Sequence, residues 1–190
     1  MDRRLPRDED GLAPDRGLRM AVRTRQLHPT IAPGARSGRF EERRVFVDAT
    51  PDEVWRALVD PARGGDMIPE ASLGVPVGAS WPAAGSHRPA RIRIGLLSEA
   101  GRATTVEARP AATFWLRVES PSMRTDWTWR LEPVAGGTRV VHVGAISARS
   151  RLTAVLVRLG RRDLGAIVDE HLAAVARQVR RANGETESAA

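Results

Sequence analysis

Histidines are the side chains of this sequence best suited to acid–base chemistry, because an imidazole changes its charge near neutral pH. The sequence has four: His28, His87, His142 and His171. His142 shares the strand parity of Val140, opposite to Val141 and Val143, so we expect it to point into the protein. A core histidine with satisfied hydrogen bonds is the commoner explanation of such a position. The functional alternative is a catalytic residue, and His142 is the first candidate.

His87 is the second catalytic candidate, because it lies in a predicted loop before a strand and could line the mouth of a cavity. His28 lies in a segment without periodicity, and no role is expected for it. His171 follows Asp169 and Glu170 on a predicted helix, where we expect it to face solvent. No two histidines have the spacing of metal ligands and cysteine is absent. We therefore predict no metal and no cofactor.

Two tryptophans on one strand predict a ligand-binding surface. Trp127, Trp129 and Leu131 alternate with polar residues, which places all three on one apolar face. The predicted ligand-binding residues are Trp127, Trp129, Phe114, Leu116, Trp81 and His142. Trp81 comes from an irregular segment and could close the entrance, since ligand pockets are mostly apolar and aromatic. The alternative is that these side chains only fill the core between sheet and helix.

The charge of the chain does not indicate a nucleic-acid partner. The net charge is +7, but the 30 basic residues are all arginine and are spread along the sequence. We therefore expect a solvated surface without nucleic-acid binding. No run of about 18 apolar residues occurs, so we predict no membrane span. The N-terminus has no apolar signal core, so we expect a cytoplasmic location.

The composition divides the chain into three parts. Residues 1–38 are rich in Arg, Pro and Gly without periodicity, and we interpret them as a disordered arm, with a basic tether for a partner as the functional alternative. Residues 40–182 carry the periodic segments and form the predicted domain. Residues 183–190 are predicted to be a frayed tail.

The domain begins with a strand over 43–49 that leads directly into a helix. Thr50 is a suitable N-cap, Pro51 suits the first helical position, and Glu53 completes a capping box. Val54, Trp55 and Leu58 form an apolar stripe. Asp60–Pro61 is expected to end the helix.

Consecutive hairpins follow, and a long helix ends the domain. Strands are predicted around 72–77, then over 90–98, 103–109, 113–120, 123–133 and 139–146, with a turn at Ala100–Gly101. This order indicates an antiparallel meander. The final helix is predicted over 150–182, with Gly160 and Gly165 in its middle and Asn183–Gly184 at its end.

This order of elements resembles the SRPBCC superfamily, the START-like, helix-grip proteins that include polyketide cyclases/dehydratases. The resemblance rests on the capped helix within 45–61 and on the hairpin segments 129–133 and 136–140, and it covers about residues 40–182. It implies an α+β fold in which a seven-stranded antiparallel sheet curls around a long C-terminal helix, with short helices after the first strand. It also implies an elongated apolar cavity.

The leading functional hypothesis is binding of a hydrophobic or aromatic small molecule between the sheet and the C-terminal helix. An enzymatic alternative is a cyclase- or dehydratase-like reaction in which His142 or His87 moves a proton. A second alternative is a regulatory or scaffold protein that acts through the basic arm.

Overall fold

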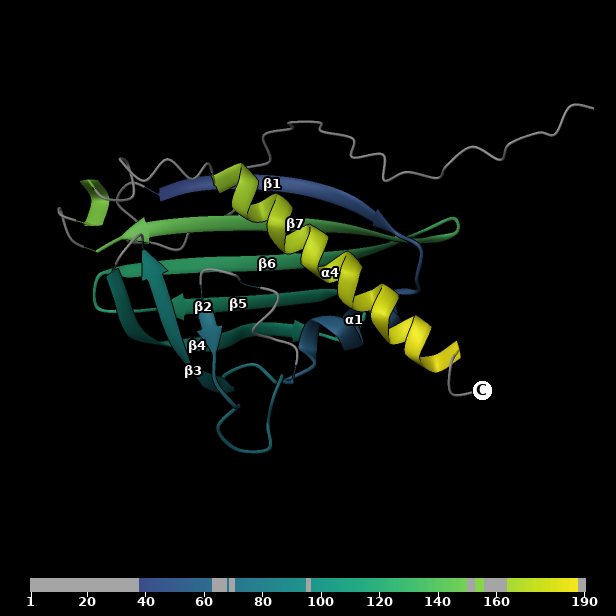
Figure 1. Cartoon of the computed structure of the whole chain (residues 1–190), viewed down its shortest axis with the longest axis horizontal. Helices are drawn as coiled ribbons and strands as arrows, with labels where there is room; N and C mark the ends of the chain where they lie inside the picture. The colour runs from purple at the N-terminus through teal and green to yellow at the C-terminus, as the bar shows by residue number, and fades with distance from the viewer. Residues whose placement is uncertain are drawn as a thin grey trace, which may run out of the picture.

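The computed structural model describes residues 38–62, 68, 71–94, 97–149, 153–155 and 164–187. These residues form one antiparallel sheet with a helix across it (Figure 1). The strands are β1 (Gly38–Val47), β2 (Ala71–Leu73), β3 (His87–Ile94), β4 (Leu97–Arg109), β5 (Thr113–Glu119), β6 (Met123–Val134) and β7 (Gly137–Ala148). Their order in space is β1-β7-β6-β5-β4-β3-β2. The predicted seven-stranded α+β helix-grip fold is therefore confirmed.

The helix α1 (Pro51–Val59) begins as its sequence predicts. The Glu53 backbone N–H donates to Thr50 Oγ1 at 3.3 Å, and the Thr50 N–H donates to Glu53 Oε2 at 2.7 Å. This capping box satisfies two backbone donors at the helix start. The helix buries Val54, Trp55, Ala57 and Leu58. Its apolar side thus covers one end of the sheet, near the final helix (Figure 1).

The helix α4 (Leu164–Glu187) crosses the sheet diagonally and contacts β1, β7 and α1 (Figure 1). We call the sheet face that packs against α1 and α4 the inner face, and the opposite face the outer face. Asn183–Gly184 was expected to end this helix, but α4 continues through both residues to Glu187. Residues 153–155 are also helical. Gly160, in the middle of the predicted helix, falls outside the described residues, as do residues 1–37 of the predicted arm.

The expected turn at Ala100–Gly101 is wrong, because both residues lie inside β4. Gly101 pairs with Ala90 of β3, and a Cβ at this position would collide with the carbonyl oxygen of Glu119 on β5. Glycine is therefore explained here by the close approach of a neighbouring strand rather than by a turn. The pairing of β3 with β4 extends as far as Ile94 and Leu97.

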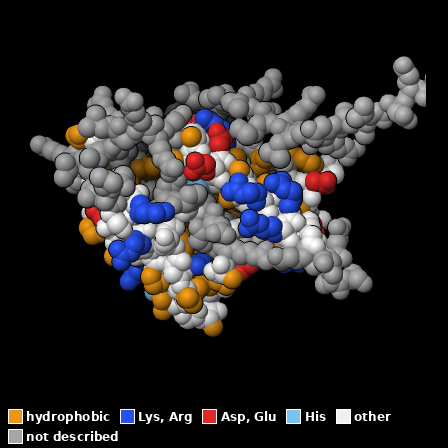
Figure 2. All heavy atoms as spheres, in the orientation of Figure 1, with side chains coloured by type: hydrophobic (Ala, Val, Ile, Leu, Met, Phe, Trp, Pro, Cys, Tyr) orange, Lys and Arg blue, Asp and Glu red, His pale blue; other side chains and the backbone are white. Residues whose placement is uncertain are grey.

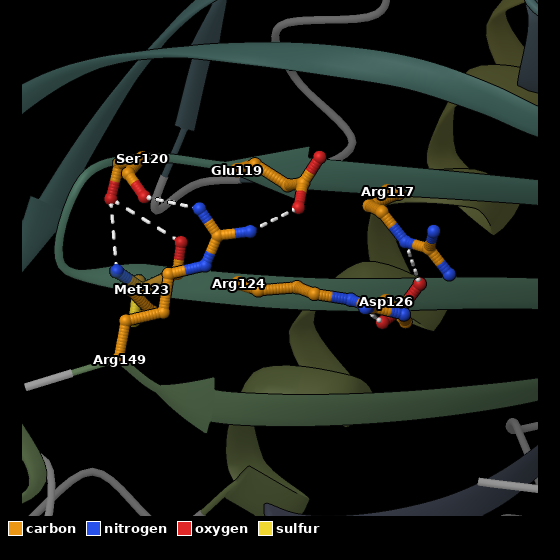
Figure 3. Close-up of polar contacts among 7 residues, drawn as sticks. All are labelled: Arg117, Glu119, Ser120, Met123, Arg124, Asp126 and Arg149. Atoms are coloured by element: carbon orange, nitrogen blue, oxygen red, sulfur yellow. Dashed lines mark hydrogen bonds and ion pairs between the residues drawn. The ribbon is translucent and has the colours of Figure 1, made fainter. Parts of the chain in front are cut away.

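Charged side chains of the outer face are joined by ion pairs (Figure 3). Asp126 accepts from Arg117 Nε and from Arg124 Nε, each at 2.8 Å, and Arg149 pairs with Glu119. Trp115 also lies on this face and donates its indole N–H to Asp126 at 3.0 Å. Ion pairs at a protein surface contribute about 0–1 kcal/mol each. The outer face is therefore a solvated surface, as the alternation of β5 and β6 predicts.

The connection between β2 and β3 projects from the sheet, and hydrophobic side chains gather at its tip (Figures 1 and 2). Val75 is 82% exposed and Val77 is 53% exposed. The same connection turns Trp81 inward, where its indole N–H donates to the Val59 carbonyl at the end of α1 at 2.8 Å. This hydrogen bond ties the connection to α1.

Candidate functional site

Strand register places three flat side chains next to one another on the inner face. Phe114 of β5 is the cross-strand partner of Trp129 of β6, and Trp129 is the partner of His142 of β7. The Phe114 and Trp129 rings stack with centroids 5.9 Å apart, and the Trp129 and His142 rings stack at 4.4 Å. All three residues have no exposed surface. We call Phe114, Trp129 and His142 the inner row.

Further aromatic side chains continue the inner row toward α1 and the β2–β3 connection. The edges of Trp55 and Trp81 each meet Phe114 with centroids 5.9 Å apart. The Arg88 guanidinium lies 5.0 Å from the centre of the Trp81 ring, within cation–π range. Its Nε donates to the Gly74 carbonyl at 2.7 Å and its Nη2 donates to the Pro61 carbonyl at 3.0 Å. Arg88 is 2% exposed, and desolvation lowers its pKa.

Trp127 occupies the next inward position along β6, and a glycine makes room for it. Its cross-strand partners are Leu116 of β5 and Gly144 of β7. A Cβ on Gly144 would collide with the Trp127 ring and lie 2.9 Å from Cγ2 of Val168 on α4. The absence of a side chain at Gly144 therefore allows α4 to pack directly over Trp127.

The most informative polar feature of the inner face is a pair of buried histidines. His142 and His171 are both completely buried, and His142 Nε2 lies 3.0 Å from His171 Nδ1. His142 Nδ1 lies 3.0 Å from the Thr128 carbonyl oxygen. A carbonyl only accepts, so His142 must carry a hydrogen on Nδ1. Trp127 lies beside both rings, with its centroid 5.8 Å from that of His142 and 4.6 Å from that of His171.

Burial and the neighbouring His171 together lower the pKa of His142 well below 6.5, against a smaller opposing effect of the Thr128 carbonyl. His142 is therefore neutral at physiological pH, and its Nε2 is an acceptor. It follows that His171 donates the Nδ1 hydrogen of the pair.

The structure places most of the predicted site residues together. Phe114, Leu116, Trp127, Trp129 and His142 are buried side by side on the inner face, and Trp81 is half-buried against Phe114. His87 does not join them. It begins β3 and is half-buried, and β4, β5 and β6 separate it from β7.

The expectation that His171 faces solvent is wrong. Asp169 and Glu170 suggested a polar helix face, but the burial of α4 follows its helical period. Leu164, Ile167, Val168, Leu172 and Val175 are buried around His171. His171 stands four residues from Ile167 and from Val175, so the periodicity of the sequence contained this signal.

Trp55 and Arg88 are the other residues that the sequence analysis did not assign to the site. Trp55 was expected only as part of an apolar helix stripe. Arg88 shares the strand parity of the buried Ala90 and Ile92, but the strand was predicted to begin only at residue 90, so this signal was missed.

Within the described parts of the chain, no three potential ligand side chains gather as a metal site would require. In those parts, no helix has the length and apolar character needed to cross a bilayer.

Comparison with solved structures identifies the same fold in proteins of low sequence identity. The ZhuI aromatase/cyclase from Streptomyces sp. R1128 superposes with a TM-score of 0.55 at 18% identity, covering 75% of this chain and 92% of that one. A norcoclaurine synthase from Thalictrum flavum superposes with a TM-score of 0.57 at 11% identity, covering 77% of this chain and 97% of that one. The protein TTHA0849 from Thermus thermophilus superposes with a TM-score of 0.58 at 17% identity, covering 77% of this chain and 99% of that one. These likenesses show the fold alone.

No functionally curated protein matches the sequence. The sequence does match the family described as "Polyketide cyclase / dehydrase and lipid transport" over residues 39–180. The matched range contains both histidines of the pair, most of α4 and all the described strands, apart from the first residue of β1. The match covers well over half of the chain. The chain therefore belongs to the polyketide cyclase/dehydrase and lipid transport family, a part of the SRPBCC superfamily.

Proposed function

We propose that this protein binds an apolar, ring-containing small molecule between the sheet and α4, against the inner row. One observation carries the proposal: Phe114, Trp129 and His142 form a continuous stacked surface on the face that α4 covers. Because Phe114 and His142 cover the two faces of the Trp129 ring, the inner row would contact a ligand through its ring edges. Ring edges carry partial positive charge and complement the face of a planar aromatic molecule. The family description and the aromatase/cyclase among proteins of this fold agree with such a ligand.

The competing explanation is that the same aromatic side chains only complete the core. The two explanations make different predictions for added ligand. A ligand that binds only the folded state raises the free energy of unfolding according to its concentration and Kd. A filled core that accepts no ligand shows no such increase.

Equilibrium dialysis with fluorene, a planar hydrocarbon, and with palmitate, a flexible chain, tests the proposal. We expect saturable binding of fluorene, weaker binding of palmitate, and a loss of fluorene affinity of about tenfold in Trp129→Ala. Trp115→Ala is the matched control, because Trp115 lies on the outer face. Absence of binding by any planar compound, or equal losses in the two variants, would contradict the proposal.

A second candidate function is proton transfer to or from the bound molecule, and the histidine pair favours it. Both nitrogens of His142 are engaged, so His142 orients the His171 ring, and His171 is the residue that would exchange a proton with the bound molecule. This assignment moves the catalytic role from His142 to His171. His87, the other candidate, is separated from the pair by three strands.

Proton transfer can be assayed by the elimination of water from the β-hydroxyketone precursor of benzylideneacetone. The conjugated product absorbs in the near ultraviolet. We expect the protein to accelerate the elimination, His171→Gln to abolish the acceleration, and His142→Gln to reduce it. Equal rates in the wild type and His171→Gln would reject proton transfer by the pair. The scaffold hypothesis concerns the basic arm, almost all of which lies outside the described residues, and stays a prediction.

A further inference from the structure

Trp129 carries a buried hydrogen-bond donor that no described residue satisfies. Its side chain has no exposed surface, and Nε1 has no hydrogen-bond partner among the described residues. Phe114 stacks on the Trp129 ring at 5.9 Å and His142 stacks on it at 4.4 Å. These contacts hold the plane of the indole, and the N–H lies in that plane.

The neighbours in the inner row cannot supply the missing acceptor. Phe114 has no acceptor atom, and the His142 nitrogens are engaged by the Thr128 carbonyl and by His171. An unpaired buried donor carries a free-energy cost, and most buried indole N–H groups have a partner. A partner from outside the polypeptide would remove this cost.

We infer that the molecule bound at this site carries a hydrogen-bond acceptor that takes the Nε1 hydrogen of Trp129. This inference rests on the proposed function and narrows its ligand class from planar hydrocarbons to planar molecules with a carbonyl or ether oxygen. The acceptor is neutral rather than anionic, because a carboxylate buried here would need a counter-charge. The arginine that reaches the aromatic cluster, Arg88, contacts Trp81 and not Trp129.

Three probes with one ring skeleton separate the acceptor from the apolar body: fluorene, fluorenone and fluorenecarboxylate. Fluorenone replaces one methylene of fluorene by a carbonyl. We expect the wild type to bind fluorenone about five- to tenfold more tightly than fluorene, and fluorenecarboxylate more weakly than fluorenone. In Trp129→Phe, which keeps an aromatic ring and removes the N–H, the ratio of fluorenone to fluorene affinity should fall to about one.

Comparing the ratio of fluorenone to fluorene affinity makes the test independent of how tightly each variant binds either compound. A general loss of packing in Trp129→Phe weakens both ligands and leaves their ratio unchanged. Trp115→Phe, which removes an indole N–H from the outer face, should keep the wild-type ratio. If Trp129→Phe does not fold, a ¹H–¹⁵N spectrum of the wild type gives the same answer, because fluorenone should move the assigned Trp129 indole N–H signal downfield and fluorene should not.

The outcomes distinguish this inference from the proposed function. Failure of all three compounds to bind would contradict both the proposed function and the inference about Trp129. Equal binding of fluorene and fluorenone by the wild type, with no specific shift of the Trp129 signal, keeps the proposed function and overturns the inference, since Nε1 then bonds an internal water or stays unpaired. Preference for fluorenecarboxylate would also overturn it, because the site would then recognise an anion.

Discussion

Replacement of Gly144 by alanine perturbs the contact on which the site depends most, the packing of α4 over Trp127. The added Cβ would collide with the Trp127 ring and lie 2.9 Å from Val168 Cγ2 and 3.0 Å from Trp127 Cε3. Both neighbours are buried, so neither can move into solvent. Overpacking of this kind costs about 1–3 kcal/mol.

The unfolded state partly offsets this cost. Alanine restricts the unfolded chain more than glycine does, which contributes about 0.4–1 kcal/mol toward the folded state. We therefore expect Gly144→Ala to lower the free energy of unfolding by about 1–2 kcal/mol. For a domain of this size such a change corresponds to a decrease in Tm of about 2–8 °C. Urea unfolding followed by tryptophan fluorescence measures it.

Gly184→Ala is the matched control within α4. A Cβ at Gly184 would have no atom within 4 Å, so the same substitution there adds no contact. Because alanine favours helix over glycine, we expect its stability to be unchanged or raised by up to about 1 kcal/mol. If Gly144→Ala destabilises the protein no more than Gly184→Ala does, then α4 does not pack on Trp127 as described.

Three further predictions concern the histidine pair, the helix cap and the buried arginine. Because the pKa of His142 is lowered in the folded protein, the unfolded chain binds the proton more readily, and stability present above about pH 6.5 is lost as the pH falls below it. Denaturant titrations should show a slope of up to about 1.4 kcal/mol per pH unit below that value, and a slope that persists fully in His142→Gln would show that another group causes it. Thr50→Ala should lower the free energy of unfolding by about 1 kcal/mol in urea unfolding, because α1 loses its capping box, and an unchanged midpoint would argue against that cap. Arg88→Lys should lower it by about 1 kcal/mol, because an ammonium cannot donate to both the Gly74 and Pro61 carbonyls as the guanidinium does, and equal stability would show that these hydrogen bonds contribute little.

Local signals in the sequence predicted the parts of the fold that depend on near neighbours. Thr50, Pro51 and Glu53 specify the start of α1 through contacts within one helical turn, and the structure has the same capping box. The alternation of β5 and β6 likewise placed Phe114, Trp127 and Trp129 on one face. Both predictions needed only the period of the backbone.

Features that depend on distant neighbours were missed or misassigned. Gly101 resembles a turn residue, yet it is required by the approach of a backbone carbonyl from Glu119 on β5, the next strand along the chain. His171 was assigned to solvent because of its charged neighbours. Its spacing from Ile167 and Val175 indicated burial, but its partner His142 lies on another element and cannot be found from the helical period. Strand register, which brings Phe114, Trp129 and His142 into one row, cannot be obtained from the period of each strand alone.

Isotope-filtered NMR of the protein with bound fluorene measures whether a planar molecule lies against the inner row. We expect intermolecular NOEs from the fluorene protons to the side chains of Phe114 and Trp129. NOEs confined to Trp115 on the outer face or to the exposed Val75 and Val77, or a spectrum without bound fluorene, would contradict it.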